Sequence, residues 1–166
     1  DALAFMAAIE HYRVSHCGLL VDSAAEVLEH SDVSRYDFRS LRRTGSISFT
    51  KKLTRDYRER WRELTGCTLF EFSFGMTETH TCDTFTWGLQ DDDFDLTSAP
   101  TFVGLPVPGT QFKVCDFASG ELLPLGSEGE LCLRSPALMH GYWQRPEESS
   151  AVLKDGWLHT GDLGQI

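Results

Sequence analysis

The chain has 166 residues, enough for one compact domain or two small lobes. Hydrophobic residues make up 41% and aromatic residues 11%, which allows a substantial core and excludes global disorder. The formal net charge of −10 disfavours a nucleic-acid-binding surface. This charge is uneven: residues 1–66 carry 11 basic and 10 acidic side chains, whereas residues 67–166 carry 4 and 15. Such an imbalance predicts two compositionally distinct lobes.

The five cysteines are scattered and form no CxxC pair, which is typical of reduced thiols. The chain also has no asparagine, no signal-peptide pattern and no apolar run near 18 residues. These features predict a cytoplasmic protein without a transmembrane segment. The sequence starts without Met and stops in what reads as a strand, so we expect a piece of a larger protein.

Helical and strand patterns alternate in the first hundred residues. This order predicts an α/β fold, with a mostly parallel sheet and crossover helices, as one half-sheet over residues 1–100. The predicted helices cover residues 2–11, 19–30 and 48–64; the predicted strands cover residues 14–17, 41–47 and 67–72.

The helix predicted over residues 48–64 is amphipathic. Its apolar face combines Leu53, Tyr57, Trp61 and Leu64, at the spacing of successive helical turns. Lysines and arginines crowd the remaining faces, and a solvated surface is favoured over a phosphate or nucleic-acid patch. The acidic run over residues 91–95 lacks calcium-loop spacing and is interpreted as a surface loop.

From residue 101 the pattern changes to short strands and turns. It predicts a small β-rich lobe, a distorted barrel, over residues 101–166. Strands are expected over residues 111–117, 130–134 and 157–160, with a short helix over residues 146–152 that begins at a proline.

Common catalytic signatures are absent from the sequence. It contains no GxxxxGK[ST], GxGxxG, HExxH or GxSxG pattern, and no zinc spacing of cysteines and histidines. Ser73, His80 and Asp83 could be imagined as a hydrolase triad, but nothing in the sequence brings them together.

Two distant stretches together indicate a nucleotide site. Phe74 could stack on a base, Gly75 allows close approach of the backbone, and Thr77 could donate to a phosphate. Glu78 offers an oxygen ligand for Mg²⁺, and Asp162 could accept both ribose hydroxyls. Each alone could instead be a core residue, a helix cap or a turn former.

Four motifs in order resemble the adenylate-forming superfamily, most closely the acyl-CoA synthetases and fatty-acid–CoA ligases. They are the segments 74–78 (FGMTE), 103–106 (VGLP), 129–147 (beginning GELCLR) and 155–162 (DGWLHTGD). The resemblance runs over nearly the whole chain and is strongest from residue 67 onward. It implies that the chain is a central section of the N-terminal domain.

The resemblance also implies an activity and its participants. The enzyme would use ATP, Mg²⁺ and coenzyme A to convert a small carboxylic acid first into an acyl-adenylate and then into a thioester. The motifs are most similar to those of enzymes that act on fatty acids. Thr77 and Glu78 would be catalytic, with Glu78 holding Mg²⁺. The other implied sites are the nucleotide contacts Gly45, Ser46, Phe74, Gly75, Met76, Thr77 and Asp162, and the acyl-pocket positions Ser73, His80 and Thr81.

The sequence departs from the family pattern at several positions. Only Gly45 stands where a glycine pair is usual, and Ser73 replaces a glycine before the aromatic residue. The family's phosphate loop and catalytic lysine are expected outside this chain, so we expect the chain alone to be inactive. A peptide-synthetase adenylation domain and a non-catalytic scaffold homologue remain the alternatives.

Overall fold

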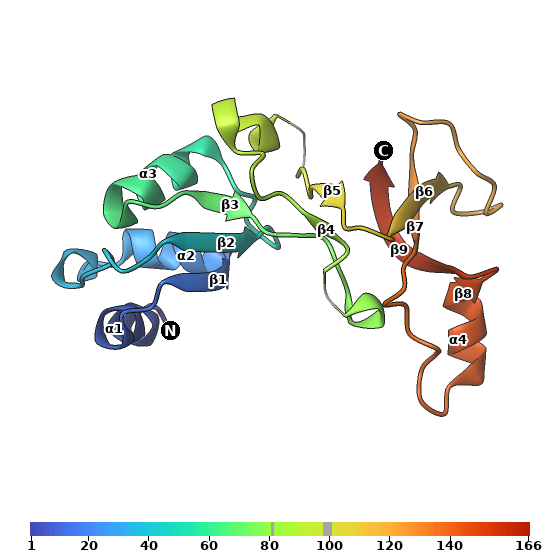
Figure 1. The fold of residues 1–166 in the computed structure, drawn as a ribbon, viewed down its shortest axis with the longest axis horizontal. Helices are drawn as coiled ribbons and strands as arrows, with labels where there is room; N and C mark the ends of the chain where they lie inside the picture. The colour runs from blue at the N-terminus through green and yellow to red at the C-terminus, as the bar shows by residue number, and fades with distance from the viewer. Residues whose placement is uncertain (81, 98–100) are drawn as a thin grey trace. The chain divides into compact units, whose positions relative to one another are not determined.

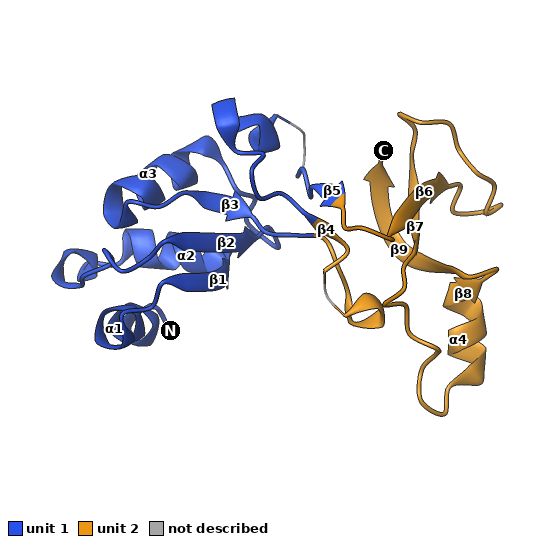
Figure 2. Cartoon of the chain, in the orientation of Figure 1, with its two compact units in different colours: residues 1–73, 85–105 blue, residues 74–84, 106–166 orange. Residues whose placement is uncertain are grey.

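A computed structural model describes residues 1–80, 82–97 and 101–166. The chain divides into two compact units, shown in different colours in Figure 2. Unit 1 comprises residues 1–73 and 85–105, and unit 2 comprises residues 74–84 and 106–166. The motif over residues 74–78 therefore belongs to the same unit as the C-terminal strands. Within the described parts of the chain, no helix is long and apolar enough to cross a membrane.

Unit 1 is built on a parallel sheet, as its alternating pattern predicted (Figure 1). The strand order is β1-β2-β3, and both neighbouring pairs are parallel. The α/β fold class is thus confirmed. The elements are α1 (Ala2–Tyr12), β1 (His16–Leu20), α2 (Val21–Glu29), η1 (Val33–Arg35), β2 (Arg43–Ile47), α3 (Arg55–Thr65), β3 (Leu69–Glu71) and η3 (Asp91–Leu96).

One hydrophobic core joins the three helices of unit 1 to its sheet. Met6, Val27, Trp61 and Leu69 are each at most 1% exposed within it. Leu20, which falls within the helix predicted over residues 19–30, instead ends β1 and is 41% exposed. Burying such apolar side chains contributes about 1.5–3 kcal/mol each, which ties the helices to the sheet.

Helix α3 begins later than its amphipathic pattern predicted. Ser48 lies in the preceding loop, where its hydroxyl accepts from the Leu53 backbone N–H at 2.9 Å. Thr54 is the residue that caps the helix, because its hydroxyl accepts from the Tyr57 N–H at 3.3 Å. Gly66 ends the helix with a left-handed φ of 77°, a conformation that glycine adopts without a Cβ penalty.

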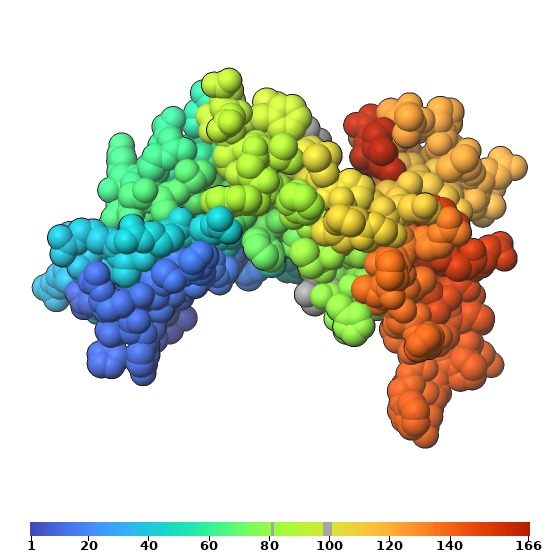
Figure 3. Space-filling model, in the orientation of Figure 1, coloured from blue at the N-terminus to red at the C-terminus, as the bar shows by residue number. Residues whose placement is uncertain are grey.

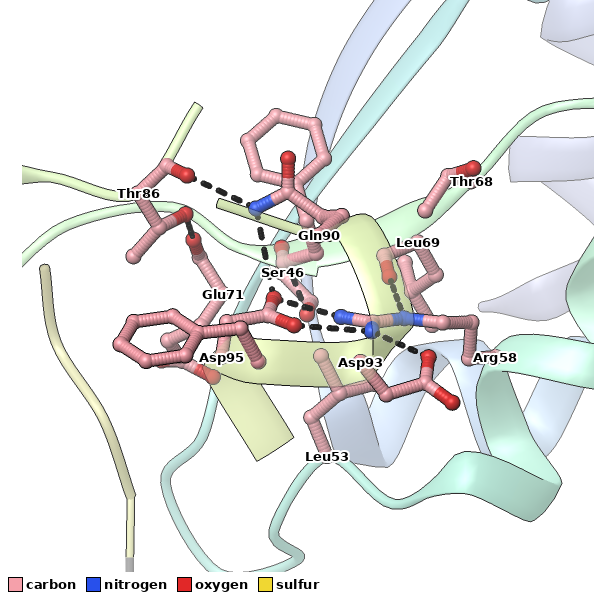
Figure 4. A network of polar contacts seen from close by, with 12 residues as sticks. Ser46, Leu53, Arg58, Thr68, Leu69, Glu71, Thr86, Gln90, Asp93 and Asp95 are labelled. Atoms are coloured by element: carbon pink, nitrogen blue, oxygen red, sulfur yellow. Dashed lines mark hydrogen bonds and ion pairs between the residues drawn. The ribbon is translucent and has the colours of Figure 1, made fainter. Parts of the chain in front are cut away.

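The interpretation of α3's charged face as wholly solvated is wrong for Arg58, which is 1% exposed (Figure 4). Its guanidinium donates to Asp95 at 2.6 and 2.8 Å, to Asp93 at 2.8 Å and to the Leu69 carbonyl at 2.9 Å. The acidic run is likewise not a free surface loop, since Asp95 is 2% exposed. The run supplies the counter-charge that a buried guanidinium requires.

Unit 2 contains an antiparallel sheet with strand order β6-β7-β9-β8, as expected for the β-rich part. A bulge interrupts the β7–β9 pairing between Glu130 and Cys132. The loop leading into α4 stands out at the surface (Figure 3), and its Trp143 is 87% exposed. The elements not yet given are η2 (Thr77–Thr79), β4 (Thr84–Phe85), β5 (Leu105–Pro106), β6 (Gln111–Cys115), β7 (Glu128–Arg134), α4 (Pro146–Val152), β8 (Leu153–Lys154) and β9 (Trp157–Gln165).

Candidate functional site

The motif segment of unit 2 is a closed loop that begins at Phe74. The Phe74 backbone N–H donates to the Thr84 hydroxyl at 2.8 Å, and its carbonyl accepts from the Asp83 and Thr84 N–H groups at 2.9 and 3.2 Å. The half-buried Phe74 ring packs edge-on against Phe112 of β6, with ring centroids 6.1 Å apart. Residues 75–78 are therefore presented from a loop whose two ends are tied together.

Glu78 is held in place from both its side chain and its backbone. Its carboxylate accepts a hydrogen bond from the Tyr142 hydroxyl at 2.6 Å, and its carbonyl accepts from the Met139 N–H at 2.8 Å. The hydrogen bond to Glu78 raises the pKa of Tyr142, so the phenol remains a donor at neutral pH. A carboxylate oriented in this way is a suitable oxygen ligand for a hard cation.

Thr77 opens the 3₁₀ turn η2 and is exposed, as is Gly75. Within the part of the chain that the structure describes, the Thr77 hydroxyl has no hydrogen-bond partner. Met76, just before the turn, is half-buried and its carbonyl accepts from the Thr79 N–H at 3.1 Å. Thr77 therefore has a hydroxyl that can donate to an anionic ligand, while its neighbours hold the turn.

Asp162 lies on β9, directly after Gly161, whose φ is 76°. Its backbone N–H donates to the Thr160 hydroxyl at 3.0 Å, and that hydroxyl donates to the Leu131 carbonyl at 2.7 Å. Partial desolvation of the carboxyl raises the pKa of Asp162, although the residue as a whole is exposed. Among the described residues none donates to this carboxylate, so both of its oxygens are available to a ligand.

The remaining predicted positions are divided between the units. Ser46 is buried in β2, where its hydroxyl donates to the Phe70 carbonyl at 3.1 Å, and is therefore already engaged. Gly45, its neighbour in β2, is also buried. Ser73 is the last residue of the first segment of unit 1, residues 1–73. His80 is exposed in unit 2 with a φ of 60°, and Thr81 lies outside the described residues.

Unit 1 contains an apolar cavity of about 380 Å³ on its sheet. Apart from Cys17, the strand residues that line it alternate with residues that face the helical core, which places the cavity on the other face of the sheet. Glycine shapes its floor, because a Cβ at Gly45 would meet the Phe72 ring at 2.8 Å. The guanidinium of Arg43 lies 3.8 Å from the Trp87 ring centroid at its border. The lining residues are His16, Cys17, Gly18, Arg43, Gly45, Ile47, Phe70, Phe72, Phe85 and Trp87.

The structure adds residues to the site that sequence reasoning missed. Tyr142 is 64 positions from Glu78, and no local pattern connects the two. Asp83 is 1% exposed, and the Thr79 hydroxyl donates to one of its oxygens. Burial raises the pKa of Asp83, and its other oxygen has no partner among the described residues. A polar run directly after the motif was the available signal for Thr79 and Asp83.

Fold and motif order together place the chain in the class of adenylate-forming enzymes, of which it is a part. The chain belongs to the AMP-binding enzyme family, whose model matches residues 1–143. The long-chain-fatty-acid–CoA ligase of Salmonella typhimurium is 45% identical over 105 residues, covering 63% of this chain and 17% of that protein. Its counterpart from Yersinia pestis is 38% identical over 140 residues, covering 84% and 23%.

The fold has solved counterparts as well. The crystal structure of the anthranilate CoA ligase AuaEII in complex with anthranoyl-AMP superposes with a TM-score of 0.80 at 26% identity. That superposition covers 99% of this chain and 30% of the ligase. The chain thus spans about a fifth of the length of the fatty-acid ligases that it resembles and about a third of this solved ligase.

Proposed function

We propose that the chain is part of an AMP-forming acid–thiol ligase that uses ATP and coenzyme A. In the first step an oxygen of the substrate carboxylate attacks the α-phosphorus of ATP, the α–β bridging bond breaks, and pyrophosphate leaves. In the second step the thiol sulfur of coenzyme A attacks the acyl carbon and AMP departs. The family membership and the names of the relatives support this reaction class.

One observation carries the assignment of roles. At the motif positions expected to contact a nucleotide, the side-chain oxygens of Thr77 and Asp162 accept no hydrogen bond from the described residues, whereas the surrounding backbone is hydrogen-bonded. Among the described residues, none engages the Thr77 hydroxyl, which is left for the α-phosphate, or the two carboxylate oxygens of Asp162, which are left for the ribose hydroxyls. Phe74, in the same motif as Thr77, offers an aromatic ring for the base. Glu78 fits Mg²⁺, because this ion commonly takes one or two carboxylates together with water and phosphate oxygens.

We further propose that the apolar cavity of unit 1 accepts the hydrocarbon part of the acid. Its apolar wall is formed mainly by Phe70, Phe72, Phe85 and Trp87, and its volume is in the range of small-molecule sites. A fatty acid is the favoured substrate class, because both fatty-acid ligases are more similar in sequence to this chain than the anthranilate ligase is.

We also place the protein in the cytoplasm, because its scattered cysteines are typical of reduced thiols.

ATP–pyrophosphate exchange in the full-length protein tests the first half-reaction without requiring coenzyme A. Asp162→Ala removes two hydrogen bonds to the ribose, each about 1.5–3 kcal/mol when one partner is charged. We expect kcat/KM for ATP to fall at least about 100-fold. Glu78→Gln should lower the rate and raise the Mg²⁺ concentration needed for half-maximal exchange.

The matched control is Glu121→Gln, which changes an exposed acid on a turn of the same unit and should leave exchange unchanged. Near-normal exchange in the Asp162 variant would reject the ribose role. The absence of exchange from the unsubstituted full-length protein with acids of graded length would favour the scaffold alternative. Transfer to a carrier-protein thiol instead of coenzyme A would identify a peptide-synthetase adenylation domain.

A further inference from the structure

A group of metal-ligating side chains lies on the antiparallel sheet of unit 2, at residues to which the proposed ligase chemistry gives no role. Cys132 of β7 pairs directly with His159 of β9, and side chains of directly paired residues share a face of the sheet. Glu130 precedes Cys132 by two residues, so it projects to that same face. One atom from each residue lies within 4.8 Å of the other two.

We propose that Glu130, Cys132 and His159 form a binding site for a divalent transition-metal ion such as Zn²⁺. The ligands would be the Cys132 sulfur, the His159 Nδ1 and the Glu130 Oε2. These three donor types, thiolate, imidazole and carboxylate, are the ones by which proteins bind zinc. Three protein ligands leave one tetrahedral position for water or a small ligand.

The distances between the donor atoms fit such an ion with a small adjustment. The Cys132 sulfur lies 3.4 Å from His159 Nδ1 and 3.9 Å from Glu130 Oε2. Zinc bonds of about 2.0–2.3 Å in tetrahedral geometry place ligand atoms roughly 3.3–3.8 Å apart. His159 Nδ1 and Glu130 Oε2 are 2.7 Å apart, so this pair would have to open by about half an ångström.

The surroundings hold the ligands in orientation. The Gly161 backbone N–H donates to the other Glu130 oxygen at 3.1 Å, which fixes the carboxylate with Oε2 toward the group. Burial and the neighbouring Cys115 raise the pKa of the Cys132 thiol to about 12, with a smaller opposing effect of Lys113, its partner across β6 and β7, so metal binding must displace the thiol proton. The side chains of Glu130 and His159 are each 12% exposed, which leaves an entry path for an ion.

The ordinary role of this group is a hydrogen bond between Glu130 and His159 beside a buried thiol. A metal site differs from that role in one measurable respect, because it produces a metal–sulfur bond. Co²⁺ is the probe, since a thiolate ligand gives it an intense sulfur-to-metal charge-transfer absorption. We expect one equivalent of Co²⁺ to produce this band in the 166-residue chain, and Zn²⁺ to displace it.

Substitutions assign the band to the site. Cys132→Ser should abolish it, and His159→Gln should weaken Co²⁺ binding at least tenfold. The matched control is Cys82→Ser, because Cys82 is an exposed thiol of the same unit. This control should retain the full band.

Far-UV circular dichroism monitors folding of each variant. If Cys132→Ser does not fold, His159→Gln and Glu130→Gln provide the reading, since both keep side-chain size. No band from the folded unsubstituted chain would overturn the proposal. A band that survives loss of the ligands, or disappears with Cys82, would overturn it as well.

Discussion

Arg58→Ala should destabilise the chain more than any other single arginine truncation on α3. Arg58 is 1% exposed and the side chain of its main partner, Asp95, is 0% exposed, so the two charges satisfy each other away from water. Among the residues that the structure describes, truncation leaves the buried Asp95 carboxylate with one donor, the Gln90 amide at 3.3 Å. Removing one partner of a buried ion pair costs about 3–5 kcal/mol, against a total stability of about 5–15 kcal/mol for a typical domain.

Urea denaturation followed by far-UV circular dichroism measures this loss. The control is Arg60→Ala on the same helix, whose ion pair with Asp56 spans one helical turn at 3.4 Å and whose two side chains are 38% and 73% exposed. We expect this control to lose at most about 0.5 kcal/mol. Because both variants remove an arginine from α3, the difference between them isolates burial of the charge.

A double variant separates the pair from the cost of its breakage. Arg58→Met combined with Asp95→Leu replaces both charges with apolar groups, and such replacements are often neutral or stabilising. We expect it to recover most of the free energy of unfolding lost in Arg58→Ala. If Arg58→Ala lowers the free energy of unfolding by less than about 1 kcal/mol, and by no more than Arg60→Ala does, the claim that this ion pair is buried is refuted.

Two further predictions concern the sheet of unit 1. Burial raises the pKa of Glu71 despite two hydrogen bonds from Ser48, so the folded state holds this proton more tightly than the unfolded state. The stability advantage of the unsubstituted chain over Glu71→Gln, measured as the difference in free energy of unfolding, should therefore fall as pH rises above about 4.3. An increase of this difference with pH would contradict the raised pKa of Glu71. Gly18→Leu should shift the acid preference of ATP–pyrophosphate exchange by the full-length protein toward shorter acids. A Cβ at Gly18 meets nothing closer than the Gly45 carbonyl oxygen at 3.9 Å, so the leucine can be accommodated and its side chain would fill the cavity. Leu125→Ala, at an 85% exposed position, is its control, and an unchanged preference would place the acyl group elsewhere.

Local patterns in the sequence predicted the elements well where local physics decides them. Helix α4 was predicted with its observed bounds, because Pro146 can occupy a first helical turn and little else in a helix. The start of α3 was missed because Ser48 engages Glu71, 23 positions away, rather than capping the helix. An amphipathic pattern cannot show such a contact, since it records periodicity along the chain and not partners across it.

The same limit applies to the candidate site. The motif residues were found from their types and order, but the anchoring of Glu78 depends on Tyr142, which the fold brings to it. Burial of Arg58 was missed for a similar reason, as its counter-charges lie 35 and 37 positions later. In both cases the residue's own neighbours in sequence carry no sign of its partner.

The division of the chain has a consequence for recombination between homologous genes. Unit 2 is discontinuous, because residues 74–84 belong with residues 106–166. The Val107 N–H donates to the Asp83 carbonyl at 2.9 Å, and the Met139 N–H donates to the Glu78 carbonyl at 2.8 Å. These hydrogen bonds tie residues 74–84 to residues 106–166. A crossover that exchanged only residues 106–166 would combine strands of one parent with the motif loop of the other. Functional chimeras should therefore be those that inherit both pieces from one parent.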